Sequence, residues 1–172
     1  MSTKQEYVIL VDANDNETGT AEKMEAHRSG TLHRAISVFI FNSEGKWLLQ
    51  KRAEGKYHSG GLWTNACCSH PRPGEDTATA AHRRLQEEMG IRCDLNHAFA
   101  FTYRAELDHD LIEHELDHIF IGRTDAVPNP DPGEVSGWKY FSTQELETAL
   151  KESPDQFTEW FKLILPRLTG VV

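Results

Sequence analysis

The sequence lacks the features that define several classes of protein. No apolar run approaches the roughly 18 residues of a membrane-spanning helix, and the apolar run at 7–11 is too short for a signal peptide. Only 3 of the 172 residues are cysteine, an odd number, and two of them are adjacent. This pattern argues against a disulfide framework and predicts a reducing, cytoplasmic location. No repeat or long linker divides the chain, so we predict one domain over residues 1–172.

Positive charge is also scarce. The chain has 18 Lys+Arg against 27 Asp+Glu, a net charge of −9, so nucleic acids and anionic membrane surfaces would be repelled at long range. We therefore expect no nucleic acid and no membrane as a partner. A small anionic substrate stays compatible, because a local basic pocket can outweigh the total charge. Histidine is abundant, with nine residues. The oligomeric state, monomer or weak dimer, stays open.

Apolar spacing and turn residues predict an α+β fold with a mixed, largely antiparallel sheet layered with helices. The clearest helix is 76–89, because Asp76 can cap it, Ala81, Leu85 and Met89 recur every four residues, and Gly90 ends it. Strands are expected at 6–11, 35–41, 46–50, 62–65, 98–104, 112–121 and 134–141, and two further helices at 143–151 and 155–165.

Three carboxylates alternate along the expected strand 112–121. Side chains two apart on a strand share a face, so Glu113, Glu115 and Asp117 lie together, and His114 points away from them. They form either a solvated sheet face or a metal site, since close carboxylates raise one another's pKa unless a cation lies between them.

A second group of reactive residues lies at 63–71. Cys68 and His70 are two apart and can be a ligand pair, a nucleophile with its base, or a buried thiol beside a surface imidazole. The absence of a Cys-x-x-Cys pair disfavours a closed structural zinc site. His27 and His33 are singly no more informative than other isolated histidines.

The segment from Ser69 to Ile91 resembles the Nudix box, Gly-x5-Glu-x7-Arg-Glu-apolar-x-Glu-Glu-x-Gly-apolar, with complete spacing from Glu75 onward. In Nudix hydrolases these glutamates bind the magnesium that activates water on a diphosphate. Two positions differ, because Ser69 replaces the first glycine and Arg84 replaces a glutamate. A fixed cation at position 84 should weaken a hydrolytic metal site, whereas its guanidinium can still hold phosphate oxygens.

The combination of motifs resembles one narrower family, the type I isopentenyl diphosphate isomerases, over nearly the whole chain. This resemblance implies a Nudix-like fold and a metal-dependent 1,3-allylic shift that interconverts isopentenyl and dimethylallyl diphosphate in isoprenoid biosynthesis. The matching stretches are Gly19–Lys23, Ala26-His27, Leu32–Arg34, Leu62–Asn65, Cys68–Pro71, Arg83-Arg84, Glu88–Gly90, Phe101–Ala105 and Glu113–Glu115.

The resemblance also implies a role for individual residues. Glu115 would protonate the alkene, Cys68, as a thiolate, would carry the complementary proton transfer, and Tyr103 would orient Glu115. One divalent ion, Mn²⁺, Zn²⁺ or Mg²⁺, would be bound by His27, His33, His70, Glu113 and Glu115. A second ion, Mg²⁺, would bridge Glu88 and the diphosphate.

The remaining implied contacts are with the substrate. Lys23, Arg52, Lys56 and Arg84 would hold the diphosphate, and Trp160 would face the carbocation unless it is an ordinary core residue. The alternative functions are a Nudix-type diphosphate hydrolase and a non-catalytic metal-binding module. Surface or packing positions are expected for Cys67, His58, His82, His97, His109, His114 and His118.

Overall fold

The computed structural model describes residues 4–172, and in this range nine strands and four α-helices form the predicted α+β structure. No helix of this range is long and apolar enough to cross a membrane. The strands are β1 (Tyr7–Val11), β2 (Glu17–Glu22), β3 (His33–Phe41), β4 (Trp47–Arg52), β5 (Trp63–Thr64), β6 (Cys67–Ser69), β7 (Leu95–Glu106), β8 (Ile112–Arg123) and β9 (Val135–Phe141). The helices are α1 (Lys23–Ser29), α2 (Thr77–Met89), α3 (Thr143–Glu152) and α4 (Glu159–Leu168), with short 3-10 turns η1 (Asp108–Asp110) and η2 (Pro154–Gln156).

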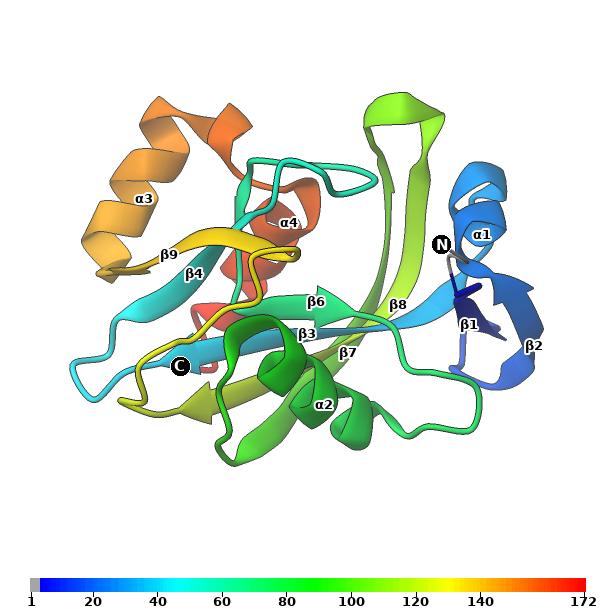
Figure 1. Cartoon of the computed structure of the whole chain (residues 1–172), viewed down its shortest axis with the longest axis horizontal. Helices are drawn as coiled ribbons and strands as arrows, with labels where there is room; N and C mark the ends of the chain where they lie inside the picture. The colour runs from blue at the N-terminus through cyan, green and yellow to red at the C-terminus, as the bar shows by residue number, and fades with distance from the viewer. Residues whose placement is uncertain (1–3) are drawn as a thin grey trace.

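Strand β3 lies at the centre of the sheet. It pairs antiparallel with β1, β4 and β6, and parallel with β8, from His33 opposite Glu115 to Phe41 opposite Arg123. Strand β8 also forms a long antiparallel hairpin with β7, whose tip rises beside α1 (Figure 1). A mixed, largely antiparallel sheet is therefore confirmed.

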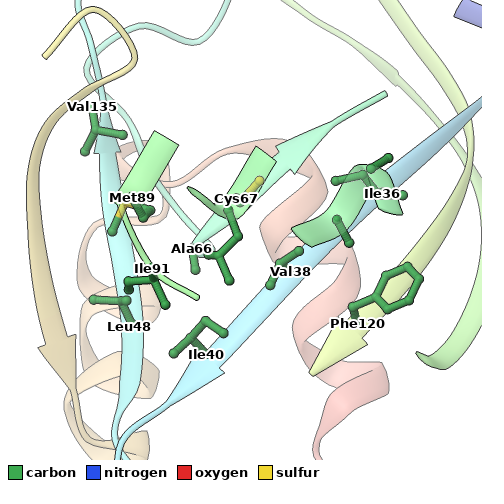
Figure 2. Packing of buried hydrophobic residues seen from close by; sticks show 13 residues of the cluster. Ile36, Val38, Ile40, Leu48, Ala66, Cys67, Met89, Ile91, Phe120 and Val135 are labelled. Carbon is green, nitrogen blue, oxygen red and sulfur yellow. The ribbon is translucent and has the colours of Figure 1, made fainter. Parts of the chain in front are cut away.

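Each face of the sheet has its own hydrophobic core, because successive residues of β3 point to opposite sides. Ile36 and Ile40 pack with α2 in the cluster shown in Figure 2. Phe39 and Phe41 pack with α4 in a second cluster. Helices α2 and α4 thus cover opposite faces (Figure 1), which we call the α2 face and the α4 face.

Two elements near the N-terminus are absent from the sequence prediction. Strand β2 is half-exposed and has no apolar alternation, and α1 has only seven residues. The carboxylate of Glu22 caps α1 by accepting from the amides of Met24 and Glu25. The last helix begins later than predicted, because Thr158 caps it and Pro154–Gln156 form a separate 3-10 turn.

Gly90 ends α2 in the left-handed conformation, as predicted, with φ +65°. A Cβ at this position would lie 2.5 Å from the carbonyl oxygen of Asn129, so Gly90→Ala adds a clash to the backbone strain. We expect the substitution to lower the free energy of unfolding by about 1–3 kcal/mol. Thermal unfolding should then show a fall in Tm of about 2–4 °C for each kcal/mol lost. Gly45→Ala is the control, since Gly45 has φ +74° and open space. An equal loss in both variants would contradict the contact with Asn129.

Candidate active site

Strand register brings the predicted carboxylates into the interior. Glu115 lies opposite His33 of β3 and opposite Tyr103 of β7. Glu113 is 5% exposed and Glu115 4% exposed, and Asp117 is fully buried. The alternative of a solvated sheet face is therefore wrong: these side chains share the α4 face with buried Ile119. His114 points the other way, as expected, and its Nδ1 lies 3.0 Å from the carbonyl oxygen of Gly30.

Three imidazoles converge on Glu115 from separate elements. His27 comes from α1, His33 begins β3 and His70 follows β6. Nε2 of His70 lies 2.9 Å from Oε1 of Glu115, and Nε2 of His33 lies 3.4 Å from the same oxygen. One ligand atom from each of these residues lies within 4.8 Å of the others. We call His27, His33, His70 and Glu115 the His/Glu group.

The hydrogen bonds of this group suit a divalent metal. Nδ1 of His27 is 2.7 Å from the carbonyl oxygen of Lys23, and Nδ1 of His33 is 2.8 Å from that of Thr31. Each Nδ1 therefore donates its proton to the backbone, which leaves the Nε2 lone pair available. Within residues 4–172 both Nε2 atoms are buried and have no hydrogen-bond partner. Neutral imidazole nitrogens and a carboxylate form a donor set that binds divalent ions.

Burial and the neighbouring groups shift the pKa values of Glu113 and Glu115 in opposite directions. Burial, and then the charge of Glu115, raises the pKa of Glu113 well above its usual range. Burial alone would raise the pKa of Glu115 too, but the hydrogen bond with Nε2 of His70 holds it well below its usual range. Burial also lowers the pKa of His70 to about 4, so its imidazole is neutral at pH 7. A divalent cation would allow both carboxylates to ionise.

The adjacent cysteines point to opposite faces of the sheet. Cys67 packs in the α2-face core of Figure 2, as expected for a small buried residue. Cys68 packs against the α4-face cluster and lines a pocket beside Glu115. Burial raises the pKa of the Cys68 thiol, although Arg52 opposes this shift. Burial thus favours the neutral thiol, and the thiolate role of Cys68 stays a prediction.

The pocket unites most of the predicted residues of the α4 face. Trp160 is buried among the α4-face residues and also lines the pocket, and its place facing a carbocation stays a prediction. The Arg52 guanidinium lies over its ring, 5.2 Å from the centroid. The phenol of Tyr103 donates to Oε2 of Glu115 at 2.8 Å. The residues lining the pocket are Arg52, Tyr57, His58, Cys68, Ser69, His70, Tyr103, Glu113, Glu115 and Trp160.

The other predicted cations lie outside this lining and are paired with carboxylates. Lys23 pairs with Glu6 and Lys56 with Glu134. Arg84 contacts Glu88, which is buried on α2, at 2.6 Å and Glu134 at 3.5 Å. Burial would raise the pKa of Glu6, but the hydrogen bond and charge of Lys23, together with the charge of Arg84, hold it below its usual value. Glu6 therefore neutralises part of the positive charge of Lys23.

Sequence reasoning missed His58 as a site residue. Its ring is 2% exposed, 5.9 Å from that of His27 and 5.6 Å from that of Trp160 between centroids. The only signal in the sequence is its position between the predicted cations Arg52 and Lys56 and the Trp63–Asn65 stretch. Glu6 and Glu134, which neutralise the cations, were also missed.

The remaining histidines match their expected surface or packing positions. His97 and His118 lie 2.9 Å apart at the sheet surface, where His118 also contacts Asp15. His82 and His109 are exposed. A larger cavity of about 660 Å³ follows α2 and residues 91–93, but none of the predicted metal ligands or catalytic residues lines it. The side-chain chemistry therefore places the candidate active site at the Cys68 pocket.

Comparison with known proteins finds a matching family model and close relatives over most of the chain. The NUDIX domain family matches residues 31–161. A protein of Pectobacterium atrosepticum named isopentenyl-diphosphate Delta-isomerase is 58% identical over 94% of this chain and 90% of its own length. One of Aromatoleum aromaticum, named isopentenyl-diphosphate Delta-isomerase 1, is 54% identical over 95% of this chain and 93% of its own length.

Solved structures support the fold at lower identity. A crystal structure from Deinococcus radiodurans has a TM-score of 0.78 at 18% identity and covers 94% of this chain and 98% of its own. That of a MutT protein from Methanosarcina mazei has a TM-score of 0.66 at 20% identity, with 81% and 94% covered. Both indicate a common architecture.

Proposed function

The chain belongs to the NUDIX family and, within it, to the isopentenyl-diphosphate Delta-isomerases, and on this premise we propose that it interconverts isopentenyl and dimethylallyl diphosphate. The observation that carries the proposal is the meeting of Cys68, Glu115 and Tyr103 in one buried pocket next to His70. An alkene isomerase needs two proton-transfer groups at one water-poor site.

The reaction moves one proton onto the substrate and another off it. One group protonates the terminal CH₂ carbon, which leaves positive charge on the tertiary carbon. The other removes a proton from the CH₂ that lies between this tertiary carbon and the CH₂ bearing the diphosphate, and the electrons of that C–H bond form the new double bond. We assign these transfers to Cys68 and Glu115. Following the family resemblance, Glu115 protonates the alkene and Cys68 carries the complementary proton transfer, and the two roles are exchanged in the reverse reaction.

Neighbouring residues support this pair. The phenol of Tyr103 fixes one oxygen of Glu115 by donating to it. The ring of Trp160 would stabilise the carbocation through its π-face by about 1–2 kcal/mol. A divalent ion, Mn²⁺, Zn²⁺ or Mg²⁺, held by the His/Glu group and Glu113 would lower the proton affinity of the carboxyl and so make it a stronger acid.

The diphosphate would be held at the mouth of the pocket. In our proposal Arg52 reaches it from the lining, and Lys23, Lys56 and Arg84 exchange their carboxylate partners for phosphate oxygens. Glu88 would hold a second ion, Mg²⁺, that bridges to the diphosphate. We further propose a cytoplasmic location for a single-domain protein over residues 1–172, supported by the three free cysteines among the described residues.

The alternative functions explain fewer residues. A diphosphate hydrolase needs a carboxylate where this chain has Arg84, and it has no use for Cys68 beside Glu115. A non-catalytic metal-binding module explains the His/Glu group but not the thiol or the surrounding cations.

One incubation separates these functions. The protein is mixed with isopentenyl diphosphate and Mg²⁺ in D₂O, and the products are followed by NMR and phosphate analysis. We expect dimethylallyl diphosphate that carries deuterium, with no free phosphate. Released phosphate or pyrophosphate would instead support the hydrolase, and unchanged substrate would support a binding module.

Replacing Arg84 tests the assignment of the diphosphate contacts. We expect Arg84→Glu to raise KM by about tenfold or more, because a hydrogen bond to a charged group contributes about 1.5–3 kcal/mol. Since Glu would also repel nearby Glu88 and Glu134, Arg84→Gln is measured beside it. Arg92→Gln is the control, because Arg92 is exposed and contacts Gln86. An unchanged KM in folded variants would show that Arg84 does not touch the substrate.

A further inference from the structure

The loop between β4 and β5 (residues 53–62) holds His58 in a fixed position. Nη2 of Arg52 donates to the carbonyl of His58 at 3.1 Å, and the amide of Ser59 donates to Oδ1 of Asp108 at 3.0 Å. Gly60 packs so closely that a Cβ there would lie 2.5 Å from the carbonyl oxygen of Glu54. These contacts set the direction of the buried imidazole.

The free side of this imidazole faces a carboxylate and a second imidazole. Nδ1 of His58 lies 3.1 Å from Oγ of Ser59, so Nε2 is the atom turned toward Glu113. Within residues 4–172, Nε2 of His58, Nε2 of His27 and Oε2 of Glu113 are buried without a hydrogen-bond partner. Unpaired buried polar atoms are costly, and three of them converging indicates a ligand that they share.

The distance between Nε2 of His58 and the Glu113 carboxylate fits a shared cation and is too long for a hydrogen bond. Nε2 of His58 lies 3.9 Å from Oε1 of Glu113, which is too long for direct hydrogen bonding. Two ligand atoms bound about 2.1 Å from the same ion are at most about 4.2 Å apart. One ligand atom each from His27, His58 and Glu113 lies within 4.8 Å of the others, so small side-chain movements complete the contact.

We propose that His58 is a metal ligand, which forms with His27 and Glu113 a second ion position beside that of the His/Glu group. Because Nδ1 of His27 contacts the Lys23 carbonyl, only its Nε2 is available to both positions. A single lone pair binds one ion, so the two positions are alternatives for the same ion. The inference rests on the proposed metal dependence of the isomerase.

Cobalt binding without substrate tests this assignment. Co²⁺ is titrated into chelator-treated protein, and both the Kd and the visible spectrum, which reports the ligand set, are recorded for the wild type and His58→Ala. We expect His58→Ala to shift the spectrum and to raise the Kd by about twofold if the two positions are equally occupied, because the ion keeps its alternative position. His82→Ala, on the exposed face of α2, is the matched control and should bind like the wild type.

The spectrum decides the result. A His58→Ala spectrum with the wild-type maxima would overturn the proposal whatever the Kd, because the ligand set would be unchanged. If circular dichroism shows that His58→Ala does not fold, the spectrum of His58→Gln is compared with that of the wild type instead.

A double variant gives a second test. In His33→Ala we expect weakened Co²⁺ binding, and in His33→Ala/His58→Ala no binding. Equal Co²⁺ binding by the single and the double variant would contradict the ion position formed by His27, His58 and Glu113. Isomerase activity of the Mg²⁺-loaded wild type is assayed separately, so failure of the proposed function is distinguishable.

Discussion

Cys68→Ala is expected to abolish measurable isomerisation, with kcat lowered by about 10²–10⁴-fold, the contribution typical of one proton-transfer group. The thiol lines the pocket beside Glu115, and alanine leaves no side-chain group that can carry a proton. The measurement is steady-state conversion of isopentenyl diphosphate, with KM determined alongside. Little change in KM is expected, because the thiol is assigned to the reacting carbons and not to the diphosphate.

The neighbouring cysteine provides a matched control. Cys67 is also buried, but it packs on the α2 face, on the other side of β6. Cys67→Ala should therefore cost some stability through a small cavity and retain most of the activity. Equal losses of kcat in the two variants would contradict the assignment of the catalytic role to Cys68.

Glu115→Gln is expected to lose both activity and bound metal. The substitution removes a proton-transfer group and the carboxylate that His33 and His70 face, so kcat should fall by about 10⁴-fold, the upper end of the range for acid–base catalysis. Metal content after purification without chelator, measured with kcat, should fall as well. A variant that keeps its metal and its activity would exclude Glu115 from both roles.

Asp117→Asn is the control for this loss of charge. Asp117 is the next carboxyl on the same face of β8 and accepts a hydrogen bond from Ser37 at 2.7 Å. Burial, and then the charge of Glu115, raises the pKa of Asp117 well above its usual range and so favours the neutral acid. The amide is similar in size and charge to that acid, and we expect metal content and most of the activity to be kept.

Elements with clear end signals and regular burial were predictable from the sequence. Helix α2 has Asp76 before it and Gly90 after it, and its apolar residues recur at helical spacing. The β3–β4 hairpin is equally clear, since both strands are almost entirely buried. Helix α1 lacks these signals because its cap is a glutamate, Glu22, and it is too short to show a period. Strand β2 is half-exposed, so burial imposes no pattern on its residues.

The site residues, too, were predictable from the sequence only where a local pattern reports them. Glu113 and Glu115 could be grouped because strand alternation is a local property of β8. His27, His33 and His70 could be joined to them only through family resemblance, since their proximity depends on the packing of three distant elements. His58 lies in an irregular loop whose course is set by contacts of Arg52 and Asp108, and no local pattern reports such contacts.

The parallel β3–β8 ladder determines where the chain tolerates changes in length. His33 faces Glu115 across an uninterrupted register, and Tyr103 faces the same residue from β7. Inserting one residue into β8 before Glu115 would shift the register by one residue, so that side chains beyond the insertion turn to the opposite face of the sheet. A residue adjacent to Glu115 in the sequence would then occupy the position of the ligand. Extra residues at His109 and Asp110, the exposed end of the hairpin tip, leave both registers intact and keep Asp108 in contact with Ser59. Grafted loops, tags and fused domains should therefore be accepted at the tip, while single-residue insertions within the ladder should be rejected.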